Sequence, residues 1–237
     1  MLNTFKNKIA VITGAANGIG AALAHGFARQ GMTVVVADLD ATGAQKTATS
    51  ISSAAIAKSV DVANAESVQA LADFCFSELG QVDLLINNAG VEAGAKTYTM
   101  IDEEDWDYVL NTNLKSVWRL SKYYTEWAAK QGVSGNIINV ASITAYRTIK
   151  GQFPYAVSKA ALVKATEIMA LEGARHGVRV NALAPGYILT DVSRVLLESE
   201  RSETFVKGIP MRRYGEFDDL DGPLLLLASD ASSYMTG

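Results

Sequence analysis

The sequence has one cysteine, two histidines and four prolines, and it lacks any long hydrophobic run. A single cysteine, Cys75, excludes a disulfide framework and a metal site built from several cysteines. The strongly apolar stretch at residues 224–228 is far shorter than the roughly 20 residues of a membrane-spanning helix. Residues 1–8 carry charge with no hydrophobic stretch behind them, so we infer no signal peptide. We therefore expect a cytoplasmic protein that binds no membrane.

Charge of one sign is not concentrated in this sequence either. Lys and Arg total 21 and Asp and Glu total 25, which gives a formal net charge of −4. A pI of 5.3 without a basic stripe argues against nucleic acid as a partner. Apolar residues make up 49% of the 237 residues, enough to bury a sizeable core.

Short runs rich in Val and Ile alternate with longer helical segments. The expected strands are residues 8–13, 33–37, 55–60, 84–87, 136–140 and 179–184, and the expected helices are residues 18–30, 42–52, 65–79, 103–131 and 153–176. Strands that are apolar on both faces are typical of parallel sheets covered on both sides by helices. The pattern predicts an α/β fold, a doubly wound parallel sheet in a single domain over residues 1–237. Such sheets often end with one more strand, which we expect to be missing because the sequence stops at Gly237.

A glycine-rich turn follows the first expected strand and opens the first helix. It reads Thr13-Gly14-Ala15-Ala16-Asn17-Gly18-Ile19-Gly20, with the spacing Gly-x-x-x-Gly-x-Gly. Glycine permits positive φ and a close approach of the backbone to a pyrophosphate, and N–H groups at a helix N-terminus hold an anion. A tight packing turn is the alternative interpretation. We predict that the turn binds a dinucleotide through residues Gly14, Asn17, Gly18, Ile19 and Gly20.

The second expected strand leads into Asp38, about 20 residues past the glycines. A carboxylate at this point can accept hydrogen bonds from an adenosine ribose diol and would repel a 2′-phosphate. The neighbouring residues Asn17 and Leu39 offer no cation to offset that repulsion. A solvated acid at a strand end is the alternative. We predict NAD, rather than NADP, as the cofactor.

Tyr155 and Lys159 are four residues apart on an expected helix and therefore share a face. A free phenol has a pKa of about 10, and a neighbouring ammonium lowers it toward the working range of a general base. Many surface helices contain such a pair by chance. Ser142 strengthens the hypothesis because it follows the strand at 136–140, at the sheet edge where ligands bind.

These motifs together resemble those of the short-chain dehydrogenase/reductase family, whose members of this type have a single Rossmann-like domain. The matching positions are residues 13–20, Asp61 and Val62, residues 87–90, Asn113 and Leu114, Ser142, Tyr155 with Lys159, and Pro185 with Gly186. The likeness runs from about residue 8 to residue 237. In combination and in this order the motifs are highly specific, although each alone is not.

The resemblance implies a role for each matching residue. Tyr155 would exchange a proton with the substrate oxygen, and Ser142 would hydrogen-bond that oxygen. Lys159 would lower the pKa of the tyrosine and bind the nicotinamide ribose, and Asn113 would hold a water that links Lys159 to solvent. Tyr155 and Lys159 would both contact the cofactor as well. The other implied cofactor contacts are Asp61 and Val62 at the adenine, Asn88, Ala89 and Gly90 along the adenosine side, and Pro185, Gly186, Ile188 and Thr190 toward the carboxamide end. No metal is required.

We therefore predict an NAD-dependent oxidoreductase that transfers a hydride between nicotinamide and a secondary alcohol or ketone, such as a polyol or cyclic alcohol. The alternatives are a 3-oxoacyl thioester reductase and a non-catalytic NAD-binding sensor, and the presence of all four catalytic-type residues favours an enzyme. The resemblance also implies a homotetramer or homodimer. We expect three loops, residues 91–100, 143–153 and 187–213, to contact the substrate, and Glu92 and Arg147 could approach it from two of them.

Overall fold

A parallel sheet forms the centre of the computed structural model, which describes residues 5–51, 55–190 and 206–237. Its strands are β1 (Ile9–Thr13), β2 (Thr33–Asp38), β3 (Ala55–Ser59), β4 (Leu84–Asn87), β5 (Gly135–Val140) and β6 (Val178–Leu183). Their spatial order is β3-β2-β1-β4-β5-β6, with every neighbouring pair parallel. From β1 the chain adds β2 and β3 on one side, and from β4 it adds β5 and β6 on the other. In such sheets a crevice forms at the carboxyl ends of the two strands where the strand order reverses, here β1 and β4.

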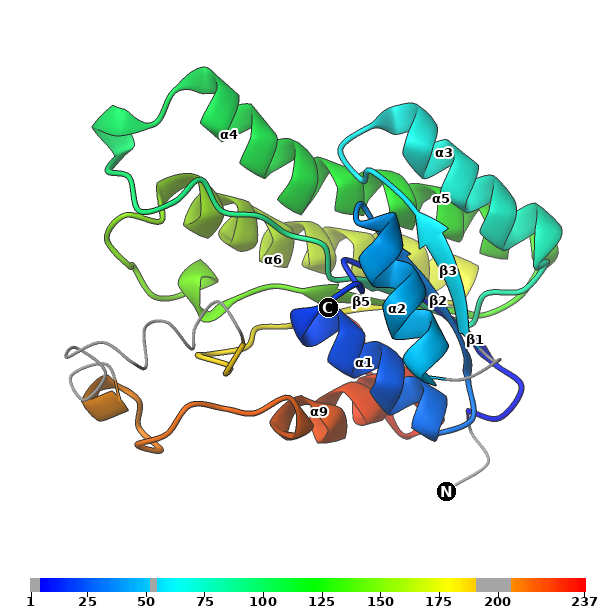
Figure 1. The fold of residues 1–237 in the computed structure, drawn as a ribbon. Helices are drawn as coiled ribbons and strands as arrows, with labels where there is room; N and C mark the ends of the chain where they lie inside the picture. The colour runs from blue at the N-terminus through cyan, green and yellow to red at the C-terminus, as the bar shows by residue number, and fades with distance from the viewer. Residues whose placement is uncertain (1–4, 52–54, 191–205) are drawn as a thin grey trace.

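Helices cover both faces of the sheet (Figure 1). One face carries α1 (Gly18–Arg29), α2 (Ala41–Ile51) and α9 (Asp218–Ala228), and the other carries α3 (Ala65–Asp73), α4 (Glu103–Leu110), α5 (Ser116–Gln131) and α6 (Phe153–Gly173). Successive side chains of a strand point to opposite faces. Val34 and Val36 accordingly join the core beneath α1, whereas Val35 joins the core beneath α3 and α5. Because each face of the sheet packs against its own apolar core, consecutive residues of a strand are apolar.

The structure confirms the expected α/β class and the doubly wound parallel sheet. Each of the six expected strands is present, with ends that differ by at most one residue from the expected ranges. In the part of the chain that the structure describes, no helix combines the length and apolar character needed to cross a bilayer.

Local residue choices determine where several helices begin and end. The Asn64 side chain accepts a hydrogen bond from the Ser67 N–H at 2.8 Å at the start of α3, and Asp102 caps α4 in the same way. Helix α5 ends at Gly132, whose left-handed φ of 66° suits a residue without a Cβ. Pro154 lies in the first turn of α6, where its missing N–H removes no helical hydrogen bond.

The helix expected over residues 103–131 is present as one helical run, which contains a wide, π-helical turn. The wide turn Asn111–Lys115 separates α4 from α5, and the Ser116 N–H donates to the Asn111 carbonyl five residues back. A second wide turn, Phe74–Glu78, follows α3, and α6 ends in the 3₁₀ turn Ala174–His176. A single extra residue in one turn leaves the apolar spacing of a helix almost unchanged, so the sequence pattern does not reveal it.

Candidate active site

The glycine-rich turn joins β1 to α1 at the crevice beside β4. Asn88, from the loop after β4, donates from Nδ2 to the carbonyl oxygens of Thr13 and Gly14, each at 2.9 Å. The Thr13 hydroxyl accepts from the backbone N–H groups of Asn88 and Ala89 at 3.1 and 3.2 Å. These bonds hold the loops after β1 and β4 together as one unit.

The glycines of this turn are required for two different reasons. A Cβ on Gly14 would lie 2.7 Å from Ala89 Cα, and a Cβ on Gly20 would overlap the Gly14 carbonyl oxygen, so close packing explains both. Gly18 has a φ of +55° and open space where a Cβ would stand. Helix α1 begins there, and its N-cap residue Asn17 makes no side-chain capping bond. The turn thus offers room and backbone N–H donors that fit a pyrophosphate.

Asp38, at the end of β2, supports the same turn. Its Oδ2 accepts from the Ala16 N–H at 2.8 Å, and its Oδ1 accepts from the Asp40 N–H at 3.0 Å. Each carboxylate oxygen has a second lone pair, so a ribose hydroxyl could still donate to it. Lys58, on the neighbouring strand β3, places its Nζ 3.4 Å from the centre of the Phe74 ring, toward α3. Its charge is therefore directed away from Asp38.

Ser142, Tyr155 and Lys159 line one cavity of about 520 Å³ at the carboxyl edge of the sheet. Ser142 follows β5, and its Oγ accepts from the Thr144 N–H at 3.2 Å. Its hydroxyl also lies near the Tyr155 phenol and favours the phenolate as a hydrogen-bond donor. One turn further along α6, Lys159 Nζ donates to the Val140 carbonyl at 2.7 Å and lies 5.6 Å from the centre of the Tyr155 ring.

Burial changes the pKa values of Tyr155 and Lys159 in opposite directions. The pKa of Tyr155 is raised, mainly by burial, while the Ser142 hydrogen bond lowers it and the charge of Glu92 raises it further. Burial lowers the pKa of Lys159 to about 8. The pKa of Tyr155 is therefore shifted upward overall, whereas the resemblance implies that Lys159 lowers the pKa of this tyrosine. Loss of water around the phenol is the largest cause of the upward shift, and Lys159 Nζ lies 5.6 Å from the ring centre.

Asn113 lies on the wide turn between α4 and α5 and is fully buried. Its Oδ1 accepts from the Val91 N–H at 2.8 Å, and its Nδ2 donates to the Val91 carbonyl at 3.0 Å and to Ser158 Oγ at 3.1 Å. A Cβ built on Gly90 would lie 3.5 Å from Asn113 Oδ1 and 3.4 Å from Lys159 Nζ, which shows that both groups approach Gly90. Asn113 therefore fixes the backbone after β4, an arrangement that we did not expect from the sequence.

The cavity brings together many of the residues singled out in the sequence. Its wall includes Ile19, Asn88, Gly90, Ser142, Tyr155, Lys159, Pro185, Gly186, Ile188 and Thr190. The other predicted cofactor residues lie outside this wall, in the turn after β1, at the end of β2 and in the segments after β3 and β4: Gly14, Asn17, Gly18, Gly20, Asp38, Asp61, Val62 and Ala89. Asn113 lies outside the wall as well, on the wide turn before α5.

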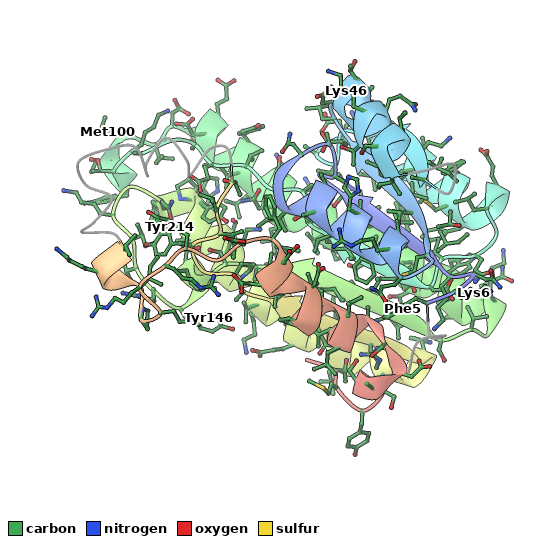
Figure 2. All side chains as sticks on the ribbon, turned by 60° about the horizontal axis from the view of Figure 1, so that its bottom comes forward. Phe5, Lys6, Lys46, Met100, Tyr146 and Tyr214 are labelled. Atoms are coloured by element: carbon green, nitrogen blue, oxygen red, sulfur yellow. The ribbon has the colours of Figure 1, made fainter. Side chains whose placement is uncertain are left out.

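The three expected substrate loops also contribute to the wall. They supply, among others, Glu92, Thr144, Ile149, Gln152 and Tyr187, of which only Glu92 was singled out from the sequence. Residues 191–205 of the third loop lie outside the described residues. Figure 2 shows Met100, Tyr146 and Tyr214, which lie in or beside these loops, on the side of the molecule opposite Phe5 and Lys6.

Comparisons with known proteins give likenesses over nearly the whole chain. A family model described as enoyl-(acyl carrier protein) reductase matches residues 14–237. The 3-oxoacyl-[acyl-carrier-protein] reductase of Thermotoga maritima is 36% identical over 98% of this chain and 94% of its own length. The 2-dehydro-3-deoxy-D-gluconate 5-dehydrogenase of Escherichia coli is 34% identical over 99% and 93%. A solved 3-ketoacyl-(acyl-carrier-protein) reductase from Brucella melitensis, complexed with NADH, has a TM-score of 0.89 at 31% identity, covering 98% of this chain and 95% of that one.

Proposed function

Because the chain belongs to the short-chain dehydrogenase/reductase family of oxidoreductases acting on CH–OH groups, we propose that it transfers a hydride between NAD and a secondary alcohol or ketone. The observation that carries this proposal is the convergence of Ser142, Tyr155 and Lys159 on one cavity. The turn after β1, with its open flank at Gly18, supports a dinucleotide beside that cavity. The substrate class we propose is a polyol or cyclic alcohol.

The side chains around the cavity suit proton exchange with an alcohol or carbonyl oxygen. Ser142 Oγ accepts from the Thr144 N–H, which leaves the serine proton for Tyr155 or for the substrate oxygen. The Tyr155 phenol would donate a proton to a carbonyl or accept one from an alcohol. Nicotinamide, when bound, supplies the hydride chemistry. Lys159 would bind the nicotinamide ribose, and Asn113 would hold the relay water that the family likeness implies.

Asp38 supports NAD over NADP. Replacing Asp38 with asparagine is expected to raise the ratio of kcat/KM with NADP to kcat/KM with NAD by about 10–100-fold, because a charge facing the 2′-phosphate is removed. The ratio is measured from the absorbance of the reduced cofactor. Asp40→Asn, which also removes an acid whose side chain accepts a backbone N–H, serves as the control. An unchanged ratio in Asp38→Asn would mean that Asp38 does not face the adenosine ribose.

A panel of substrates tests the reaction class and the alternative. The purified chain is assayed with NAD or NADP on secondary alcohols and polyols, and in the reverse direction on a 3-oxoacyl thioester. Turnover of polyols or cyclic alcohols with NAD is the expected result. A preference for the thioester would favour the 3-oxoacyl reductase alternative. Two of the relatives are named as reductases of this kind, which supports that alternative. Turnover of none of these compounds would contradict the proposal.

We also propose a homodimer or homotetramer that buries the outer surfaces of α4, α5 and α6. Tyr108 and Trp118 are 52% and 53% exposed there, and α6 exposes Phe153, Ile168 and Leu171. Large apolar side chains gathered on neighbouring helices are typical of protein interfaces. Light scattering after size-exclusion chromatography should give two or four times the chain mass of 25.3 kDa. A mass of one chain would contradict this proposal.

A further inference from the structure

Glu92 stands on a fixed part of the loop that follows β4. The residue before it, Val91, is held by Asn113 through its backbone N–H at 2.8 Å and its carbonyl oxygen at 3.0 Å. A side chain next to this double anchor starts from a defined backbone position, which reduces the entropy lost when it binds a ligand. Glu92 lines the same cavity as Ser142 and Tyr155.

The Glu92 carboxylate has no partner within residues 5–51, 55–190 and 206–237. It makes neither an ion pair nor a side-chain hydrogen bond there. Glu92 is exposed, and the loss of part of the water around its carboxyl raises the pKa of that group above its usual value. The charge of Glu92 also reaches Tyr155 and raises its pKa, so both side chains act on one small region. A carboxylate that has lost water without gaining a protein partner is stabilised when a ligand supplies a hydrogen-bond donor.

The charges around the cavity narrow the class of ligand. Lys159 is the only basic residue in the wall as the described residues form it, and its ammonium is buried against the Val140 carbonyl. A substrate carboxylate or phosphate beside Glu92 would be repelled with little compensation. A ketone or thioester oxygen only accepts hydrogen bonds and would gain nothing from a second acceptor. A hydroxyl donates, and it therefore suits this position.

We propose that Glu92 accepts a hydrogen bond from a hydroxyl on the carbon next to the reacting carbinol and thereby selects vicinal diols, as in polyols, over monoalcohols and 3-oxoacyl thioesters. The inference rests on the proposed function, which places the reacting oxygen at Ser142 and Tyr155. A vicinal diol carries the oxygen that reacts at Tyr155 and a second hydroxyl that can donate to Glu92 in the same cavity. Glu92 is thus a specificity residue for the same cavity.

A matched pair of substrates tests this inference: trans-1,2-cyclohexanediol and cyclohexanol, which differ by the second hydroxyl. In the wild type the diol should have the higher kcat/KM. Glu92→Ala is expected to lower kcat/KM for the diol by about 10–100-fold, the range for losing a hydrogen bond to a charged group. For cyclohexanol the same variant should change kcat/KM by less than about threefold. Glu92→Gln keeps an acceptor oxygen and should lie between the wild type and Glu92→Ala.

Glu78→Gln is the control for loss of one negative charge, because Glu78 is exposed in the wide turn after α3 and does not line the cavity. This variant should leave kcat/KM unchanged for both substrates. An equal loss for diol and monoalcohol in Glu92→Ala would indicate a structural role and overturn the inference. An unchanged kcat/KM for the diol in Glu92→Ala would also overturn it. A wild type with equal kcat/KM for the diol and cyclohexanol would do the same.

A binding measurement separates this inference from the proposed function. Calorimetry on the NADH-saturated protein gives the Kd of each compound without turnover. The expected result is tighter binding of the diol than of cyclohexanol in the wild type, with the difference removed in Glu92→Ala. If no alcohol is turned over, the proposed function fails, yet this difference in Kd would still support a diol site at Glu92. Equal Kd values, or no binding of either compound, would overturn the inference.

Discussion

Replacing Tyr155 with phenylalanine is expected to lower kcat for alcohol oxidation by about 10²–10⁴-fold, the usual contribution of a positioned acid or base. The substitution removes only the phenol oxygen, which lies near Ser142 at the cavity wall. Binding of NADH should change by less than about threefold, because the ring and the turn after β1 remain. Turnover and cofactor fluorescence measure the two effects separately.

Tyr146→Phe is the matched control for this substitution. Tyr146 is 71% exposed and lies outside the cavity wall, so the loss of its hydroxyl should affect kcat far less, and Tyr234→Phe, at a fully exposed tyrosine outside the three substrate loops, should leave kcat unchanged. A Tyr155→Phe enzyme that retained most of its activity would contradict the assignment of Tyr155 as the acid or base. Since burial raises the pKa of Tyr155, the wild type should also oxidise alcohols faster as the pH rises above neutrality, when more phenolate forms.

Replacing Lys159 with methionine is expected to have opposite effects on activity and stability. A pKa lowered from 10.5 to about 8 corresponds to a penalty of about 3 kcal/mol for the charged form in the folded state. Methionine removes this penalty but leaves the Val140 carbonyl without its donor, at a cost of about 1 kcal/mol. The cofactor-free variant should therefore gain about 1–2 kcal/mol in free energy of unfolding at pH 7, while kcat falls by about 10²-fold or more.

The pH dependence of the stability difference gives a further check. Below pH 8 lysine is protonated in both the folded and the unfolded chain, so the wild type carries the whole penalty. Between pH 8 and 10.5 the folded chain loses its proton first, and the wild type gains stability relative to Lys159→Met.

Urea unfolding at several pH values would show whether the difference between the two proteins narrows. Lys164→Met, an exposed lysine of the same helix that pairs with Glu167, should show no such trend. If Lys159→Met is less stable than the wild type at pH 7, the charged Lys159 does not lower the stability of the folded chain as we expect.

The strands were predictable because their physical cause is local. Runs such as Val34–Val36 are apolar on both faces, and only a sheet covered by two helical layers buries both. The wide, π-helical turn between α4 and α5 was not predictable in this way. This turn buries Thr112 and Asn113, which are polar, and adds one residue to a periodic pattern that tolerates the shift.

The candidate site was partly predictable for a different reason. Its glycines and the spacing from Tyr155 to Lys159 are short-range patterns, and the strand ends bring them to one edge of the sheet. The direction of the pKa shift at Tyr155 depends on how much water the folded chain removes, which the sequence does not express. The bonds from Asn88 to Thr13 and Gly14 likewise depend on the distance between two loops in the folded chain.

The two hydrogen bonds between the Asn113 side chain and the Val91 backbone divide the loop after β4 into two parts. Residues before Val91 are tied to the turn after β1, whereas residues 92–100 lie beyond the anchor and contact α4 and the segment before α6, through Lys96 with Asp105 and with Gln152. Exchange of the outer part can therefore alter substrate preference while the geometry around Lys159 stays in place. For protein engineering, residues 92–100 form a replaceable cassette, with a natural splice point immediately after Val91.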